Sequence, residues 1–208
     1  MKIFKKVLLT NDDGYGSDGL KILTEVLKHF SDQVYIVAPL RNMSGASRSI
    51  TLNKNINFKK KSSFEWVVDG TPSDSMIFAL NKIFDNDLPN YIFSGINSGS
   101  NIGDEIHYSG TVGAAYEGAI RGIPSVALSQ AITNDKSVNF EISKLNLPKV
   151  LMKIKDYFSS NFSLLNVNFP CCTPTDVKEI LLTKCCNQKM SDNLFINEEK
   201  KYFKIGVM

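Results

Sequence analysis

Short apolar runs alternate with helical stretches through the first two-thirds of this chain, and this alternation constrains the fold more than any other feature. Apolar runs of strand length occur at residues 4–9, 34–37, 91–93 and 126–128. Helical stretches occur at residues 20–30, where apolar residues recur every three or four positions, and at 111–121. Short buried strands joined by helices are typical of a parallel sheet that is covered on both faces. The sequence therefore predicts an α/β fold with a mostly parallel sheet and helices on both of its faces.

Residues 50–69 interrupt this alternation, and their pattern is typical of a β-hairpin. Apolar and polar residues alternate at 50–58 and again at 64–68. An alternation of period two favours half-buried strands. We therefore expect a hairpin insert at about 50–69, with the basic run Lys59-Lys60-Lys61 in a solvated loop.

The last part of the chain has a different pattern. A strand is expected at 164–169, where a proline ends it, and the apolar runs at 180–182 and 202–205 could pair as a long hairpin. The sequence thus predicts a main domain at 1–170 and a C-terminal hairpin arm at 171–208. Because an isolated hairpin is marginally stable in water, we expect the arm to pack on the main domain or on a second subunit, in a homodimer or homotetramer.

Composition argues against several functional classes. The 208 residues carry a formal net charge of +3 and no dense basic region, so a nucleic acid polymer is not an expected partner. No apolar run approaches the roughly 20 residues that a membrane helix needs, and the run after Lys5-Lys6 is too short for a signal peptide. The four cysteines form two adjacent pairs without the spacing of a zinc or redox site. We expect a cytoplasmic protein with reduced thiols and no membrane partner.

Polar segments that contain glycine follow three of the expected strands. They cover residues 10–14, with the sequence Thr-Asn-Asp-Asp-Gly, residues 41–45 and residues 94–101. In an open parallel sheet, ligands bind outside the carboxyl ends of the strands. The three segments are therefore expected to share one site.

Asp12 and Asp13 are the residues in these segments that most strongly indicate a bound cation. Aspartates also cap turns and helix starts, so a purely structural role stays open. Two adjacent carboxylates repel each other, however, and this favours a bound cation. With side-chain oxygens from Ser44 and Asn97 they would form an all-oxygen site that suits Mg²⁺ or Mn²⁺. The sequence predicts one such divalent cation per subunit.

Residues 14–19 match the pattern GxGxxG between a strand and a helix, which proposes a dinucleotide site. Two observations oppose this interpretation. Asp12 and Asp13 would repel a pyrophosphate unless a cation intervened, and the second strand ends without an acidic residue that could bind a ribose hydroxyl. A dinucleotide site is therefore not expected.

Residues 109–115 begin a helix with hydroxyl groups and free backbone amides. Such a helix N-terminus favours an anion such as phosphate, but Ser109 or Thr111 could also act as a simple N-cap, and both roles can hold at once. The two histidines, His29 and His107, form no triad with a candidate serine or cysteine. Nucleophilic catalysis of the Ser-His-Asp type is therefore not expected.

Several motifs occur together in a fixed order along residues 3–130, with a weaker one at 166–170. They are Thr-Asn-Asp-Asp-Gly at 10–14, Ala-Pro at 38–39, Ser-Gly-Ala-Ser-Arg-Ser-Ile-Thr-Leu at 44–52, Gly-Thr-Pro-Ser-Asp at 70–74, Ser-Gly-Ile-Asn at 94–97 with Asn101 and Gly103, and Ser-Gly-Thr-Val at 109–112. This set resembles the survival protein E (SurE) family of metal-dependent nucleotidases.

The resemblance implies a Rossmann-like catalytic domain that binds a divalent metal. It also implies hydrolysis of nucleoside 5′- and 3′-monophosphates and, in some members, of short polyphosphate. The positions that fall on the family's metal ligands are Asp12, Asp13, Ser44 and Asn97. The positions that fall around the phosphate are Thr10, Asn11, Gly45, Asn101, Ser109, Gly110 and Thr111. Catalytic roles are expected for Asp12, Asp13 and Asn101.

The expected chemistry is metal-assisted hydrolysis, in which Asn101 and the amides near 109–111 hold phosphate oxygens. A covalent aspartyl-phosphate route of the haloacid dehalogenase type is disfavoured, because it uses two aspartates separated by one residue. The rival from another class is a nucleotide-binding sensor module without turnover. Family members usually continue into a final strand with a pattern like Gly-Tyr-Val-Ser-Ile-Thr-Pro-Leu. This sequence reaches Met208 without it, so either it is truncated or the closing segment is absent.

Overall fold

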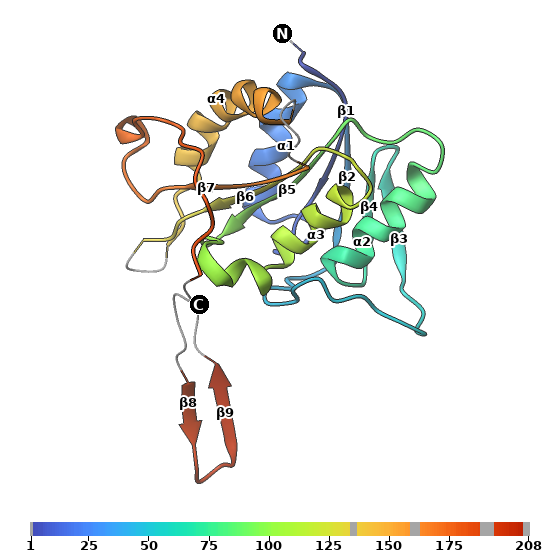
Figure 1. The fold of residues 1–208 in the computed structure, drawn as a ribbon. Helices are drawn as coiled ribbons and strands as arrows, with labels where there is room; N and C mark the ends of the chain where they lie inside the picture. The colour runs from blue at the N-terminus through green and yellow to red at the C-terminus, as the bar shows by residue number, and fades with distance from the viewer. Residues whose placement is uncertain (1, 134–136, 159–162, 188–193, 206–208) are drawn as a thin grey trace.

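A mostly parallel seven-stranded sheet forms the centre of the molecule (Figure 1). The computed structural model describes residues 2–133, 137–158, 163–187 and 194–205. The strands are Phe4–Thr10 (β1), Ser31–Pro39 (β2), Phe58–Ser62 (β3), Glu65–Val68 (β4), Tyr91–Ser98 (β5), Ser125–Gln130 (β6) and Leu164–Phe169 (β7). Their order is β3-β4-β2-β1-β5-β6-β7, and β3 runs antiparallel to β4 while the other pairs are parallel. The predicted α/β fold is confirmed.

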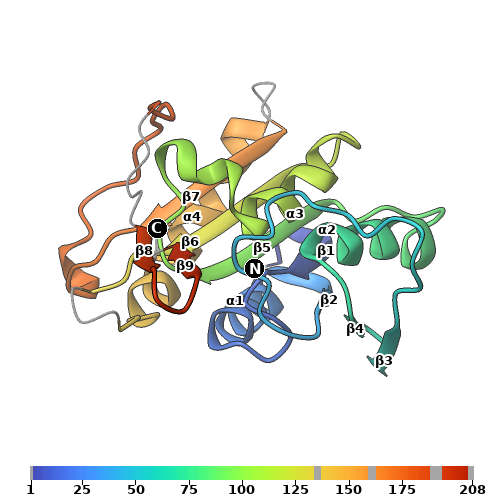
Figure 2. The same cartoon turned by 90° about the horizontal axis from the view of Figure 1, so that it is seen from below.

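Helices cover both faces of this sheet, as Figure 2 shows from below. The helices are Asp18–Phe30 (α1), Pro72–Phe78 (α2), Gly110–Ala119 (α3) and Glu141–Phe158 (α4), with short helical turns at Ala79–Ile83 (η1), Gly103–His107 (η2) and Pro174–Asp176 (η3). Successive residues of a strand point to opposite faces. Leu9 of β1 therefore packs in the core with α1 and α4, whereas Leu8 packs with Met76 of α2 and Ala114 of α3. In the described part of the chain, no helix combines the length and apolarity that crossing a bilayer requires.

Helix α1 lies unusually close to β5, and a glycine makes this possible. Its apolar residues Leu20, Leu23 and Leu27 recur at helical spacing and are buried against the sheet. A Cβ atom on Gly19 would overlap the carbonyl oxygen of Ile96 in β5. Gly16, by contrast, has open space around it. The last glycine of the GxGxxG pattern thus serves helix–sheet packing.

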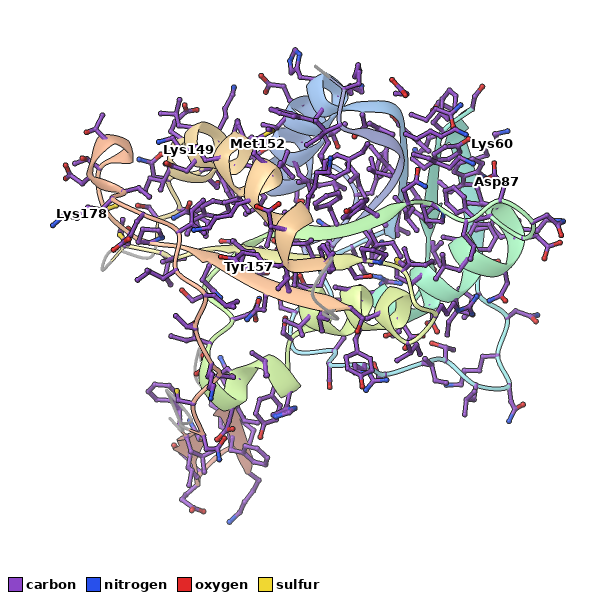
Figure 3. The ribbon with its side chains drawn as sticks, turned by 45° about the horizontal axis from the view of Figure 1, so that its top comes forward. Lys60, Asp87, Lys149, Met152, Tyr157 and Lys178 are labelled. Atoms are coloured by element: carbon purple, nitrogen blue, oxygen red, sulfur yellow. The ribbon has the colours of Figure 1, made fainter. Side chains whose placement is uncertain are left out.

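The predicted hairpin insert is partly wrong. The hairpin forms, but its first strand is β3 at Phe58–Ser62, so the prediction of a strand that begins at residue 50 is wrong. Its second strand, β4, joins the main sheet beside β2. The lysine run lies within β3 and not in a loop. Lys60 lies at the molecule's edge (Figure 3), with its ammonium 5.3 Å from the ring centroid of Trp66. Every side chain of β3 is exposed, so this strand has no buried face for an apolar alternation to reveal.

The predicted C-terminal hairpin is also only half right. Tyr202–Ile205 forms a strand, β9, but its partner is β8 at Leu194–Asn197 and not the run at 180–182. Ile180 instead packs against the main core, and the Lys153 ammonium donates to its carbonyl oxygen over 2.7 Å. Leu181 and Leu182 beside it are exposed, so this apolar run forms neither a strand nor a fully buried segment. The β8–β9 hairpin projects away from the sheet (Figure 1), with exposed apolar side chains on both strands.

Candidate active site

Asp12 and Asp13 lie just after the end of β1 at Thr10, at the point where the strand order reverses. The chain continues from β1 to β2 on one side and later to β5 on the other, and ligands of such sheets bind at this switch point. The turn after the pair depends on Gly14, which has a φ of +97° and approaches Arg41 so closely that a Cβ atom would lie 2.8 Å from the carbonyl carbon. The Met43 amide also donates to the Asp12 carbonyl oxygen over 2.7 Å. The loops after β1 and β2 are therefore held together.

The carboxylate of Asp12 faces the start of α3 and is only 3% exposed. The Thr111 hydroxyl donates to Oδ1, and a Cβ atom on Gly110 would lie 3.0 Å from Oδ2. Burial raises the pKa of Asp12, while the Thr111 hydroxyl and the backbone amides of Thr111 and Gly110 act in the opposite direction. Ser109 is the N-cap of α3, because its Oγ accepts from the Val112 amide over 3.1 Å. The positive end of the α3 dipole thus faces the carboxylate of Asp12.

The carboxylate of Asp13 is less buried and binds the loops after β2 and β5. Its Oδ2 accepts from the Ser98 amide over 3.1 Å, and its Oδ1 accepts from Asn42 Nδ2 over 3.4 Å. Asn42 Oδ1 in turn accepts from the Ser44 amide over 2.8 Å. Burial and the neighbouring charge of Asp12 raise the pKa of Asp13 to about 6. The three strand-end segments that were expected to share a site do meet, around Asp13.

The two carboxylates fit a bound cation. The ion pairs of the described residues involve other acids, namely Asp18, Asp69, Asp87 and Glu25. Within the described ranges, neither Asp12 nor Asp13 has a cationic side chain against it, although both are strongly desolvated. Asn11 Oδ1 and Thr10 Oγ1 beside them are buried without a hydrogen-bond partner. Two desolvated carboxylates without a counter-charge are an environment that a divalent cation would relieve.

Neutral oxygens would have to complete the ligand set of such a cation. Across the described residues, no three His, Cys, Asp or Glu side chains come together as a metal-binding group. Asn97 suits the role, because its Nδ2 donates to the Gly99 carbonyl oxygen over 2.8 Å and leaves Oδ1 as an acceptor. Ser44 lies in the exposed turn beside Asn42. Oxygen ligands of this kind are those that Mg²⁺ and Mn²⁺ prefer.

The residues expected around a phosphate have different surroundings. Both N–H groups of Asn11 are used to hold the following loop, one on the Gly14 carbonyl oxygen and one on Ser17 Oγ. Gly45 has a φ of +76° and open space beside it. Asn101 is 7% exposed and makes its hydrogen bonds to β6 and β7, which lie two and three strands from β1. Asn101 therefore lies farther along the sheet edge than the carboxylates, beside the ends of β6 and β7.

Two contacts of the site were not found by sequence reasoning. Asn42 lies inside one of the expected segments, but a side chain in a turn belongs to no periodic pattern that would single it out. Ser98 acts through its backbone N–H, which every residue except proline carries. Neither contact has a signal in the sequence.

Comparisons with known proteins show the family of this chain. The family model described as Survival protein SurE matches residues 7–192. The chain belongs to the SurE family. A protein named 5′-nucleotidase SurE from Wolbachia pipientis wMel is 46% identical over 166 residues, which cover 79% of this chain and 65% of that protein. Another of that name, from Campylobacter lari, is 45% identical over 188 residues, which cover 86% of this chain and 72% of that protein.

A solved SurE structure has the same fold. The crystal structure of the SurE protein from Aquifex aeolicus matches with a TM-score of 0.80 and 34% sequence identity. The match covers 96% of this chain and 81% of that one. The chain thus spans about two-thirds of the length of the Wolbachia relative and somewhat more of the Aquifex protein. The predicted SurE membership is confirmed.

Proposed function

We propose that this SurE chain is a divalent-metal-dependent phosphomonoesterase that hydrolyses nucleoside 5′-monophosphates, and also 3′-monophosphates and short polyphosphate. The observation that carries the proposal is the desolvated pair Asp12 and Asp13, which has no cationic partner among the described residues and lies at the switch point of the sheet. The names of the Wolbachia and Campylobacter relatives support a nucleotide as the substrate.

Asp12, Asp13, Ser44 and Asn97 would together hold one Mg²⁺ or Mn²⁺. When bound, such an ion neutralises charge on phosphoryl oxygens and lowers the pKa of a coordinated water. The protein orients the two carboxylates in advance: Thr111 holds Asp12, and the Ser98 amide holds Asp13. A carboxylate oxygen of the pair that does not bind the metal would accept a proton from the attacking water.

The remaining groups would bind the phosphate. One N–H of the Asn101 side chain donates to Ser129 Oγ, and the other is left to donate to a phosphate oxygen. The N-terminus of α3 at Ser109, Gly110 and Thr111 adds the favourable end of a helix dipole. Asn11 shapes the loop through its two N–H groups, and the open side of Gly45 leaves room for the substrate.

Removing the metal should abolish this activity. Phosphate release would be measured from a panel of nucleoside 5′- and 3′-monophosphates and short polyphosphates, before and after exhaustive chelation. We expect activity to disappear and to return with Mg²⁺ or Mn²⁺ but not with monovalent salt, because the site offers only hard oxygen ligands. Full activity after chelation would exclude the mechanism. Metal-dependent nucleotide binding without any release of phosphate would instead favour a sensor module.

We also propose that the β8–β9 hairpin mediates self-association into a homodimer or homotetramer. Leu194, Phe195 and Ile196 on one strand and Tyr202 and Phe203 on the other are all exposed. A two-stranded hairpin is marginally stable alone in water, so a second copy would supply its missing core. Light scattering should report a smaller particle when Phe195 and Phe203 are both changed to lysine. The exposed Leu145 and Met152 on α4, changed in the same way, serve as the control, and an unchanged mass for the hairpin variant would contradict the proposal.

A further inference from the structure

The main chain of Asn101 is held by two side chains of β7. The Asn101 amide donates to Asn168 Oδ1 over 2.8 Å, and Asn168 Nδ2 donates back to the Asn101 carbonyl oxygen over 3.0 Å. Asn166 Nδ2 donates to the same carbonyl oxygen over 2.7 Å. We call Asn166 and Asn168 the β7 clamp. It supplies the hydrogen bonds that a neighbouring strand would otherwise give to this backbone.

The sheet geometry explains why both clamp residues reach Asn101. They lie two positions apart on β7, so their side chains share one face of the sheet. In the parallel register Asn168 lies beside Ser129 of β6, and Ser129 Oγ accepts from Asn101 Nδ2 over 2.7 Å. The last strands of the sheet therefore fix both the main chain and the side chain of Asn101.

The backbone around Asn101 lacks the regular contacts that would hold it in place. Asn101 lies between Gly99 and Gly103, which have φ angles of +121° and +56° and thus sit where the backbone departs from regular structure. Beyond the bond from the Gly99 amide to the Gln130 carbonyl oxygen, this segment leaves the ladder of β5 and β6. A segment between two such glycines needs other contacts to stay in one place.

We propose that Asn166 and Asn168 are positioning residues that act through Asn101 on the bound phosphate. The amide group is planar, so once one N–H is fixed on Ser129, the direction of the other is set by the position of the main chain. The clamp sets that position. The inference rests on the proposed function, in which the second N–H binds a phosphate oxygen, and it assigns a role to the Asn-Val-Asn sequence at 166–168.

The two clamp residues differ in their expected effects. Asn168→Ala removes two of the three hydrogen bonds and should lower kcat about 10- to 30-fold, because displacements of less than an ångström already misalign reacting groups. Asn166→Ala removes one bond and should cost less than about 10-fold. Metal affinity should stay unchanged in both variants, since neither residue contacts Asp12 or Asp13.

A double-mutant cycle tests whether Asn168 acts through Asn101. Turnover is measured for the wild type, Asn101→Ala, Asn168→Ala and the double variant, with Asn146→Ala as a control. Asn146 is also hydrogen-bonded and is more buried than Asn168, but it lies on α4 and donates to the Ile142 carbonyl oxygen. We expect Asn168→Ala to cost nothing further once the Asn101 side chain is gone, and Asn146→Ala to leave kcat unchanged. The same loss from Asn168→Ala in both backgrounds would overturn the inference, because damage to the fold is additive.

A binding measurement separates this inference from the proposed function. If the wild type hydrolyses no nucleotide, the proposed function fails, and the same cycle is run on the affinity for inorganic phosphate in the presence of Mn²⁺. Weaker phosphate binding in Asn101→Ala and in Asn168→Ala, with no further loss in the double variant, would support the clamp. Unchanged affinity in Asn168→Ala, or no phosphate binding by the wild type, would overturn it.

Discussion

Replacing Asp13 with asparagine should lower the turnover of a nucleoside monophosphate by at least about 10²-fold. The substitution keeps the size of the side chain and its contact with the Ser98 amide. It removes one of two anionic ligands from a site for a hard cation, so metal affinity should fall and a coordinated water should be less acidic. If Asp13 only caps a turn, the rate should change little, because asparagine caps almost as well as aspartate.

The same variant should be more stable than the wild type in the absence of metal at pH 7. Burial and the charge of Asp12 raise the pKa of Asp13 from 3.8 to about 6. When folding raises the pKa of a carboxyl, ionising that group costs more in the folded state than in the unfolded state. The free energy of unfolding therefore falls as the pH rises from the unfolded pKa to the folded pKa. The cost is therefore absent below about pH 4, grows up to about pH 6 and is complete above it. The Asp13→Asn variant escapes this cost, so its advantage on the order of 1 kcal/mol at pH 7 should vanish toward pH 4.

Asp18→Asn provides the matched control for both measurements. Asp18 is an exposed acid in the first turn of α1, paired with Lys21 over 2.8 Å, and it lies a few residues beyond the same loop. Its turnover should stay within about twofold of the wild type, because an exposed pair contributes little. Near-normal turnover of Asp13→Asn at saturating metal would remove Asp13 from the site.

Replacing Gly19 with alanine should destabilise the protein by about 3 kcal/mol, although the same change raises helix propensity by about 1 kcal/mol in an exposed helix. The new Cβ atom would overlap the Ile96 carbonyl oxygen, so α1 or β5 has to move. The melting temperature should fall by roughly 6 to 12 °C for a chain of this size.

Lys28→Ala on the solvent side of α1 is the control for this change, and its melting temperature should be unaltered or slightly higher. A neutral or stabilising effect of Gly19→Ala would contradict the close packing of α1 on β5. Calorimetry on the metal-free protein keeps ligand binding out of the comparison.

Sequence reasoning predicted the buried elements well and the exposed ones poorly. The strands β1 and β6 lie inside the sheet, so burial on both faces makes them continuous apolar runs. Strand β3 fails for the opposite reason, because it is an exposed edge strand that carries lysines, a common protection against unwanted pairing. The run at 180–182 shows that apolar residues alone do not identify a strand, because only Ile180 packs on the core while Leu181 and Leu182 are exposed.

The site divides in a similar way. The sequence singles out Asp12 and Asp13, because two adjacent carboxylates after a strand repel each other. Their role as metal ligands stays a prediction. The contacts that orient them could not be predicted. They come from a turn side chain at Asn42, a backbone amide at Ser98 and the start of α3, and their positions depend on loop geometry that residue types do not specify.

The contacts that complete the site join residues far apart in the chain. Thr111 lies 99 positions after Asp12, Ser98 lies 85 after Asp13, and Asn168 lies 67 after Asn101. At a synthesis rate of 5–20 residues per second, Asp12 leaves the ribosome roughly 5 to 20 s before Thr111. Contacts between residues so far apart in the chain also form late in folding, because closing the long loop between them costs conformational entropy before the contact stabilises the fold. The carboxylate pair is therefore synthesised first and enclosed last. If the pair holds a cation as proposed, a nascent chain has no preformed site for it, and metal affinity should report the completion of folding.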